Sequence, residues 1–294
     1  MICTFRIELT GRVQGCGVRP ALVRAARAHA LTGCVMNVGD RVVILLQGDQ
    51  SQVLEFTERL QSFLPTLAQV RHQKSEQVDN TEKFTDFSIV QTLESTNVPG
   101  IPEIPPDRGI CAACLQELFA PQSRRYLWPF IGCSECGPRY SWLRRLPFIR
   151  RHTTFDQFQP CKNCAKEYTS TNDRRVSMEL IACAECGPTL YYRDQTTNFL
   201  VQGAWMHAVA TLQKGGIVAL QGFSGFHLLA RAADENAVMR LRAFKSRQEK
   251  PLAILVDSVR QVGELAFCSE TEANWLTGAH RPIVLLKKKD TLLW

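Results

Sequence analysis

The 294-residue sequence predicts an α+β multidomain protein, and three observations support this fold class. The first ninety residues alternate strand-like and helix-like patterns. A middle region repeats its cysteines at an interval of fifty residues, and a last region again alternates helices and strands. We therefore expect domains at 1–92, 109–192 and 203–294, with a proline-rich linker at 93–108.

The first region has the element order of a ferredoxin-like sandwich. Apolar alternation predicts strands, and apolar residues spaced by three or four predict helices. In chain order, the expected elements are a strand at 2–9, a helix at 20–31, a hairpin of 33–38 and 41–47, a helix at 50–63 and a strand at 84–90. This β-α-β-β-α-β order predicts one sheet with two helices covering one face.

The decamer GRVQGCGVRP, residues 11–20, joins the first expected strand to the first expected helix. Glycine lets a backbone approach a ligand closely, so the N–H groups of this loop can converge on an anion. Pro20 suits the first helical position, which places Arg19 at the cap with its guanidinium free to clamp a phosphate. The alternative is a sharp turn whose glycines only meet backbone requirements. The loop matches neither a Walker A loop nor a dinucleotide fingerprint.

The composition limits the class of protein without choosing its ligand. Lys and Arg number 35 against 28 Asp and Glu, and the net charge of +7 suits an anionic small molecule as well as a nucleic acid. No apolar run is long enough to cross a membrane, and Arg6 and Glu8 interrupt any signal peptide. We expect a cytoplasmic protein without a membrane partner, whose cysteines bind metal rather than form disulfides.

Eight of the twelve cysteines form two equivalent sets of Cys-x-x-Cys pairs. The expected ligands are Cys111, Cys114, Cys133, Cys136, Cys161, Cys164, Cys183 and Cys186. Within each repeat eighteen residues separate the two pairs, and four thiolates close a tetrahedral site with no open position. The sequence therefore predicts two structural Zn²⁺ ions, in preference to redox dithiols or plain buried cysteines. The repeat favours one ion per repeat, and a nested arrangement of outer and inner pairs is the alternative.

Some residues near these motifs carry weaker signals. Cys16 is expected to be a packing residue, although a thiol exposed at a helix N-terminus would have a lowered pKa. His152 is the one histidine that we consider as an auxiliary metal ligand. The arginine-rich intervals SRRY and LRRLPFIRR leave RNA or a client protein open as a partner, but a solvated face is the favoured explanation.

From residue 203 the pattern is that of an α/β domain. Helices are expected at 204–215 and 234–246, and strands at 216–222, 251–256 and 282–287. The last strand lies close to the end of the sequence, so the expected sheet is incomplete and has an open edge.

Three regions of the sequence resemble known families. GRVQGCGVRP resembles the phosphate loop of acylphosphatases, and IGCSECGPRY with ACAECGP resembles a double zinc region. GGIVALQGFSGFHLLARAAD and LRAFKSRQEKPLAIL resemble a YrdC-like nucleotide-binding domain. In this order they resemble the hydrogenase maturation carbamoyltransferase family HypF, with only part of the YrdC-like domain present.

The resemblance implies specific roles for individual residues. The phosphate-binding loop would consist of Gln14, Gly15, Cys16, Gly17, Val18 and Arg19. Within it, Arg19 would grip the phosphoryl group, while Asn37 would orient the attacking water. In the YrdC-like region, Lys245, Arg247 and Lys250 would face the phosphates of ATP.

The same resemblance implies a reaction and partners. Carbamoyl phosphate, or another acyl phosphate, would be hydrolysed at the loop. In the full-length family the released carbamate is adenylated with ATP, for which Mg²⁺ is the expected ion, and passed to a cysteine of the partner HypE. The C-terminal ATPase-like domain that completes this transfer is absent, so we expect hydrolysis without complete transfer.

The sequence also departs from the family pattern at specific positions. Cys16 and Val18 replace the usual packing residues of the loop, and RRVSMELIAC lacks a histidine and a proline often found there. Gln221 stands where HypF proteins commonly have lysine. A non-catalytic scaffold that binds RNA or a maturation partner is therefore the alternative function, and a short product without a function of its own is a third.

Overall fold

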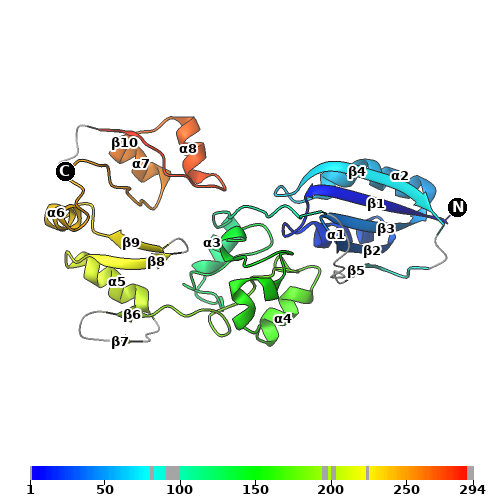
Figure 1. Cartoon of the computed structure of the whole chain (residues 1–294), viewed down its shortest axis with the longest axis horizontal. Coiled ribbons are helices and arrows are strands. Elements are labelled where there is room, and N and C mark those ends of the chain that lie inside the picture. The colour runs from blue at the N-terminus through cyan, green and yellow to red at the C-terminus, as the bar shows by residue number, and fades with distance from the viewer. Residues whose placement is uncertain are drawn as a thin grey trace. The chain divides into compact units, whose positions relative to one another are not determined.

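The computed structural model describes residues 2–79, 83–90, 100–193, 198–199, 203–222 and 225–289 (Figure 1). They belong to two compact units, residues 1–187 and 188–294. Residues 91–99, which include positions 93–99 of the expected linker, lie outside the described residues. Within the described ranges, every helix lacks the length or the apolar character that a membrane crossing needs.

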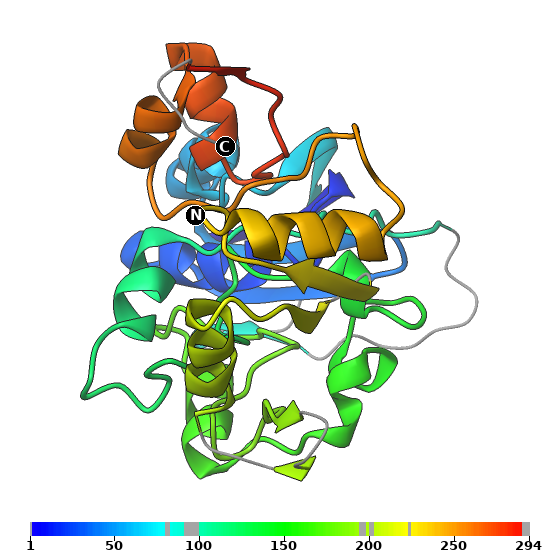
Figure 2. The same cartoon turned by 90° about the vertical axis from the view of Figure 1, so that its left-hand side faces the viewer.

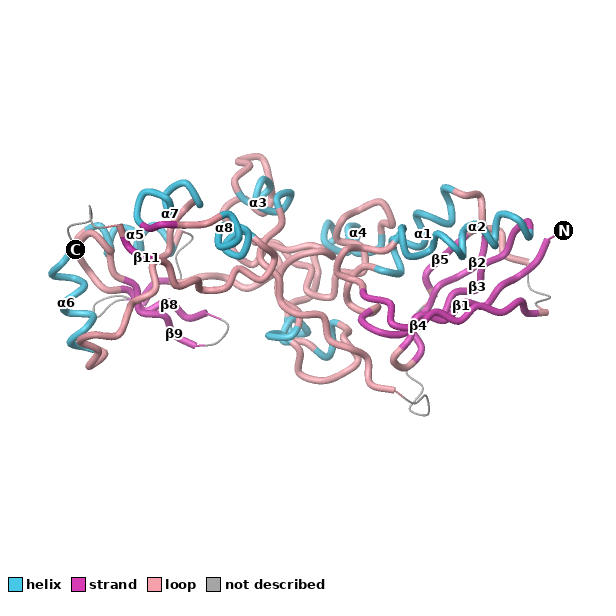
Figure 3. Tube along the Cα trace, turned by 90° about the horizontal axis from the view of Figure 1, so that it is seen from above, coloured by secondary structure: helices cyan, strands magenta, loops and turns pink. Residues whose placement is uncertain are grey.

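Five strands form the sheet of the first unit, in the order β4-β1-β3-β2-β5. They are β1 (Ile2–Arg12), β2 (Thr32–Val38), β3 (Arg41–Asp49), β4 (Gln69–Val78) and β5 (Phe87–Ile89). β1 is antiparallel to β3 and β4, while β2 is antiparallel to β3 and parallel to β5. Helices α1 (Val18–Ala28) and α2 (Gln50–Arg59) lie on the same face of the sheet (Figure 3). The predicted ferredoxin-like fold is thus confirmed.

One apolar core holds both helices against the sheet. Ile7 of β1 and Ile44 of β3 are direct cross-strand partners, and both are fully buried. Leu22 of α1 and Phe56 of α2 are buried in the same core. Each such side chain stabilises the fold by roughly 1.5–3 kcal/mol. Because β1 and α1 are both fixed by this core, the loop between them has fixed ends.

Strand β4 is the element that the sequence pattern misses. Its residues, QVRHQKSEQV, are mostly polar and exposed because β4 is an edge strand with little contact with the core. The strand expected at 84–90 does form, but as the short β5 at the opposite edge. The fourth strand of the ferredoxin-like order is therefore β4. Helix α2 also ends early, and its last expected residues form the 3-10 turn η1 (Leu60–Phe63).

Helix α1 begins at Val18, before the expected start at Pro20. Gly17 is the N-cap residue, with a left-handed φ of 79° that glycine adopts without a Cβ penalty. Pro20 fits inside the first turn because the first four N–H groups of a helix have no intrahelical acceptor. Arg19 therefore lies in the first turn of α1 rather than at its cap.

The two cysteine repeats form the rest of the first unit, with little regular structure. Their elements are α3 (Ala112–Leu118), η2 (Tyr140–Trp142), η3 (Arg150–His152), η4 (Thr154–Gln157) and α4 (Lys162–Thr169). Leu127 and Ser177, fifty residues apart, both have a left-handed backbone, with φ of 52° and 53°. Their N–H groups donate to the carbonyls of Leu118 and Tyr168, which are again fifty residues apart. The repeat in the sequence is therefore a repeat of backbone structure.

The second unit consists of short elements, and Figure 2 looks onto it. Its helices are α5 (Ala204–Gln213), α6 (Glu235–Phe244), α7 (Val259–Leu265) and α8 (Glu270–Thr277). Its strand pairs, all antiparallel, are β6 (Tyr192–Arg193) with β7 (Asn198–Phe199), β8 (Val218–Gly222) with β9 (Gly225–Leu229), and β10 (Ala266–Phe267) with β11 (Lys287–Lys288). The two expected helices and the first expected strand of this region are present.

Two expected strands of this unit do not form. Residues 251–256 and most of 282–287 have irregular backbone, and in the described part of the chain no strand pairs with them except at 287. A strand needs a hydrogen-bonded neighbour, so apolar character alone is not enough. Leu255 is 93% exposed and Ile283 is 86% exposed. Residues 290–294 lie outside the described part.

Candidate functional site

The loop between β1 and α1 has the backbone of an anion cradle. Gly15 and Gly17 both have positive φ, at 67° and 79°, which turns the chain sharply into the helix. The N–H of Ala21 donates to the Gly17 carbonyl at 3.2 Å, so the N–H groups before Ala21 stand at the open, positive end of α1. Such a helix N-terminus favours phosphate or carboxylate.

A recess in the first unit combines this loop with both cysteine repeats; we call it the loop recess. Its loop side includes Gly15, Gly17 and Arg19. Its other wall includes Ser134 and Arg139 from the first repeat and Ser177 and Glu179 from the second. The sequence gives no sign of this second wall, because its residues lie more than a hundred positions after the loop.

Arg139 joins the first cysteine repeat to the loop. Its guanidinium is buried and donates to the Gly15 carbonyl at 3.3 Å. It also donates to the carbonyls of Cys136, Gly137, Cys133 and Ser134 at 2.6, 2.8, 3.1 and 2.7 Å. Five acceptors around one buried guanidinium hold the turn of the repeat and the loop in a single arrangement. Arg139 belongs to the IGCSECGPRY motif, but nothing in that motif indicates a contact with the loop.

Arg19 lies partly exposed in the loop recess, with the buried carboxyl of Glu179 in the same recess. Burial lowers the pKa of Arg19, while the charges of Glu179 and Tyr168 oppose that shift. An arginine remains charged under any ordinary condition. A positive charge therefore stands beside the open N-terminus of α1.

Asn37 lies on β2 and is 7% exposed, and it is not among the residues that line the loop recess. Its side-chain oxygen has no hydrogen-bond partner among the described residues. The Gln14 amide donates to the carbonyls of Gly39 and Arg41, at 2.9 and 3.2 Å. Gln14 thus ties the loop to the turn that follows Asn37, and its side chain serves the loop's position. A buried acceptor without a partner is a place for a water or a ligand group.

Cys16 is a packing residue of the loop. Its side chain is fully buried, and its thiol points to the Arg12 carbonyl at 3.6 Å. Burial raises the pKa of Cys16 to about 12, against the lowering effect of Arg139 and Arg12. The thiol is therefore protonated at neutral pH, as expected for a packing role.

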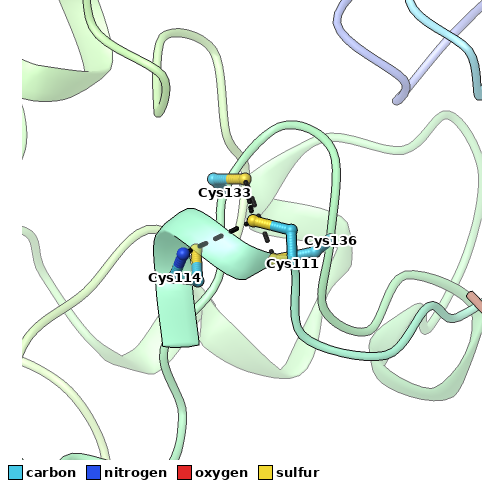
Figure 4. Close-up of side chains that lie close together, drawn as sticks. All are labelled: Cys111, Cys114, Cys133 and Cys136. Carbon is cyan, nitrogen blue, oxygen red and sulfur yellow. Dashed lines mark hydrogen bonds between the residues drawn. The ribbon is translucent and has the colours of Figure 1, made fainter. Parts of the chain in front are cut away.

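The eight repeat cysteines gather in two groups of four, one from each repeat. The first cysteine centre is Cys111, Cys114, Cys133 and Cys136, and the second cysteine centre is Cys161, Cys164, Cys183 and Cys186. Within each centre the sulfur atoms all lie within 4.8 Å of one another, and Figure 4 shows those of the first centre converging. The structure therefore groups the four cysteines of each repeat, as the fifty-residue repeat favoured, and not the outer and inner pairs of the nested alternative.

The spacing of the sulfur atoms fits a tetrahedral zinc ion. Neighbouring sulfur atoms are 3.8 and 3.7 Å apart in the first centre, and 3.9, 3.8 and 3.6 Å apart in the second. A Zn–S bond of about 2.3 Å gives a tetrahedron with edges of about 3.8 Å. All twelve cysteines are free of disulfides. Each centre therefore suits one structural zinc ion. His152 belongs to neither centre, and its ring contacts the Pro147 carbonyl at 2.9 Å.

Arginines link each cysteine centre to the opposite repeat. Arg124 and Arg125 of the first repeat donate to the sulfur of Cys164, at 3.1 and 3.6 Å. Arg174 of the second repeat donates to the sulfur of Cys114 at 2.8 Å. A guanidinium offsets the negative charge that four thiolates retain around a divalent ion. The two centres thus stabilise each other reciprocally.

Acidic and backbone contacts complete this exchange. The Glu167 carboxylate accepts a hydrogen bond from the Arg125 guanidinium at 2.6 Å, and the Glu117 carboxylate accepts one from Arg175 at 2.7 Å. Arg125 also donates to the Ala182 carbonyl, and Arg175 to the Gly132 carbonyl, at 2.8 and 3.0 Å. Arg125 and Arg175 are 1% and 4% exposed. A solvated face is thus the wrong explanation for Arg125 of the SRRY interval, which is buried against a carboxylate, whereas Arg144 and Arg145 of the LRRLPFIRR interval are exposed, as expected.

The residues expected to face a nucleotide lie on one loop of the second unit, after α6. Lys245 and Lys250 are exposed, and Arg247 is partly exposed. Arg242 donates to the carbonyls of Arg247, Gln248 and Lys250 at 3.2, 3.1 and 3.1 Å. Arg242 thus shapes the loop that carries the three basic side chains, a role that sequence reasoning missed.

Comparison with known families defines the class of protein. The Acylphosphatase family matches residues 5–89, the HypF finger family matches 110–143 and 161–192, and the family described as Telomere recombination (Sua5, YciO and YrdC) matches 210–293. The chain therefore joins an acylphosphatase-like domain to zinc-finger modules and a YrdC-like region.

Comparison with whole proteins gives the particular family. Carbamoyltransferase HypF of Synechocystis sp. is 43% identical over 295 residues, which cover 100% of this chain and 38% of the relative. Carbamoyltransferase HypF2 of Cupriavidus necator is 43% identical over 287 residues, which cover 97% and 35%. The crystal structure of full-length HypF in the phosphate- and nucleotide-bound form matches with a TM-score of 0.89 at 35% identity, covering 98% of this chain and 38% of that chain. The chain belongs to the HypF carbamoyltransferase family and spans less than two fifths of the length of these relatives.

Proposed function

We propose that this chain hydrolyses carbamoyl phosphate at the loop recess, as the N-terminal part of a HypF-type carbamoyltransferase in [NiFe]-hydrogenase maturation. One observation carries the proposal: Arg19 lies in the first turn of α1, beside the open N-terminus of that helix, and lines the loop recess. The relatives are named carbamoyltransferases, and one solved relative is described as phosphate-bound. Other acyl phosphates share the phosphoryl group and would enter the same cradle.

The chain's own groups suffice for the hydrolytic step. The loop N–H groups and Arg19 hold the phosphoryl oxygens and stabilise the charge that develops on them. The oxygen of Asn37 accepts a hydrogen bond from the attacking water and so orients the water toward phosphorus. The water oxygen bonds to phosphorus, and the phosphorus–oxygen bond to the acyl group breaks. Phosphate and carbamate leave, and the proton of the water passes to solvent. The two cysteine centres, which would hold zinc, support the second wall of the recess.

Further steps belong to the whole carbamoyltransferase. Lys245, Arg247 and Lys250 are proposed to bind the phosphates of ATP, with Mg²⁺ as the accompanying ion, so that carbamate can be adenylated. One solved relative is described as nucleotide-bound, which supports this role. Gln221, in β8, replaces a lysine common in the family and removes one cation from this site. A HypE-like protein is the proposed acceptor of the carbamoyl group.

The alternative, a non-catalytic scaffold for RNA or a maturation partner, is not favoured. The relatives that match the whole chain are named as enzymes. The arginines of the SRRY interval, which suggested RNA, are engaged with carboxylates, sulfur atoms and carbonyls. A binding module would also have no use for Arg19 in the loop recess.

The test is phosphate release from carbamoyl phosphate by the purified, zinc-loaded chain. Arg19→Ala and Asn37→Ala should each lower the rate by about a hundredfold or more, as does loss of one oriented donor in other enzymes. Arg24→Ala is the matched control, because Arg24 lies exposed on the same helix outside the loop recess. A folded wild type that releases no phosphate would refute the proposal.

A further inference from the structure

Glu179 is an unexpected group to find beside a phosphate cradle. It lines the loop recess together with Arg19 and is 6% exposed. A carboxylate repels a phosphoryl dianion, so this position would weaken phosphate binding if the side chain faced the phosphoryl group. The position is reasonable if Glu179 faces the other half of an acyl phosphate, the acyl group.

The neighbours of Glu179 fix its carboxyl group. The backbone N–H of Arg150 donates to Oε2 at 2.8 Å, and the Tyr168 hydroxyl lies 3.2 and 3.3 Å from the two carboxyl oxygens. The Arg150 side chain also donates to the Glu179 carbonyl at 2.9 Å. The carboxyl is therefore held in one orientation rather than left mobile. Each carboxyl oxygen has two lone pairs, so Oε1 keeps an acceptor position beyond the one that Tyr168 uses.

The surroundings also favour the neutral form of this carboxyl. Burial raises the pKa of Glu179, against the lowering effects of the Arg150 N–H, Arg19 and Tyr168. A bound phosphoryl dianion adds a further negative charge and favours the neutral form more. In either protonation state an acceptor position remains on Oε1, because the Arg150 N–H donates to Oε2.

We propose that Glu179 is a specificity-determining residue that selects a carbamoyl over an acetyl group on the acyl side of the substrate. A carbamoyl group presents an N–H donor, and Oε1 of Glu179 keeps an acceptor position for it. One hydrogen bond can form between them. An acetyl group presents a methyl in place of the N–H, so one bond is lost and a carboxyl oxygen faces carbon. This inference rests on the proposed hydrolysis at the loop recess.

Substitutions separate this role from a structural one. Glu179→Gln keeps an acceptor beside a donor, because an amide has a carbonyl oxygen and an NH₂ group. Glu179→Leu keeps much of the volume and offers neither. Both variants retain the backbone contacts that Arg150 makes to residue 179 and to the Ile181 carbonyl. The cysteine ligands are unchanged, so zinc content and thermal unfolding serve as fold controls.

The experiment measures kcat/KM for carbamoyl phosphate and for acetyl phosphate with the full chain. The wild type and Glu179→Gln should prefer carbamoyl phosphate, and Glu179→Leu should reduce that preference by roughly threefold to tenfold, the effect of one lost hydrogen bond. The loss should fall mainly on carbamoyl phosphate and leave acetyl phosphate nearly unchanged.

Different failures have different meanings. An unchanged preference in a folded Glu179→Leu, or an equal loss on both substrates, would overturn the role of Glu179 while leaving hydrolysis in place. If Glu179→Gln loses the preference as completely as Glu179→Leu, the hydrogen bond to the side-chain oxygen of residue 179 is refuted. If the wild type releases phosphate from neither carbamoyl phosphate nor acetyl phosphate, the proposed function is overturned, and this inference with it. Abolition of both reactions in Arg19→Ala would place them in the loop recess.

Discussion

Substitution of Arg174 by alanine should weaken zinc binding at the first cysteine centre and spare the second. Arg174 belongs to the second repeat, yet it donates to the sulfur of Cys114 at 2.8 Å. A hydrogen bond to a charged group contributes about 1.5–3 kcal/mol, and the lower end applies because the Arg174 side chain is 32% exposed. About 1.5 kcal/mol corresponds to a roughly tenfold loss of zinc affinity, within the range found for groups that support metal ligands.

The assay is chelator competition followed by alkylation of the released thiols and peptide mass spectrometry. Arg174→Ala should expose Cys111, Cys114, Cys133 and Cys136 to alkylation at a lower chelator concentration than in the wild type. Arg124→Ala is the mirror control, because Arg124 donates to Cys164 of the second cysteine centre. Equal release from both centres in Arg174→Ala, or selective release from the second, would refute the reciprocal arrangement.

Three further predictions concern the first unit. Phe87→Ala should lower the free energy of unfolding by about 3–5 kcal/mol, because the Phe87 side chain points from β5 into the core and is fully buried. Ser88→Ala, at the exposed neighbouring position, should change it by less than about 0.5 kcal/mol, and urea unfolding compares the two variants. Burial tends to raise the pKa of Glu8, but Arg41 and Arg6 outweigh it and the pKa is lowered, so Glu8 adds stability above the ordinary carboxyl pKa that is lost as pH falls through the lowered value. Glu8→Gln should therefore flatten the acid side of the unfolding midpoint against pH, and a parallel curve would contradict the pairing. Cys16, with its pKa raised to about 12 by burial, should resist iodoacetamide near pH 8 in the native chain while the partly exposed Cys268 reacts, and rapid labelling of native Cys16 would contradict its burial.

The sequence patterns predicted those helices, strands and cysteine groups that are determined by residues close together in the sequence. The hairpin of β2 and β3 and the amphipathic α1 follow from apolar periodicity, and the fifty-residue repeat predicted which four cysteines meet. The polar β4 was missed because an edge strand needs no apolar alternation. The strand expected at 251–256 failed for the opposite reason, since an apolar segment becomes a strand only beside a partner.

The site divides in the same way. The glycine-rich loop and Arg19 are visible as a motif because they lie together in the sequence. The opposite wall of the loop recess, with Arg139 and Glu179, comes from two distant segments that only the folded cysteine repeats bring to the loop. A lone arginine or glutamate in such a segment has no periodicity or spacing that distinguishes it from a surface residue.

The contact between Arg139 and Gly15 sets an order of events during biosynthesis. The two residues are 124 positions apart, so the loop leaves the ribosome long before the guanidinium that will fix it. The five-stranded sheet is complete by residue 89 and can form while the cysteine repeats are still being translated. The loop recess, in contrast, gains its second wall only after both cysteine repeats, as far as Glu179 and Leu180, have been translated and have packed against the loop. The site is therefore completed later than the domain that carries its loop.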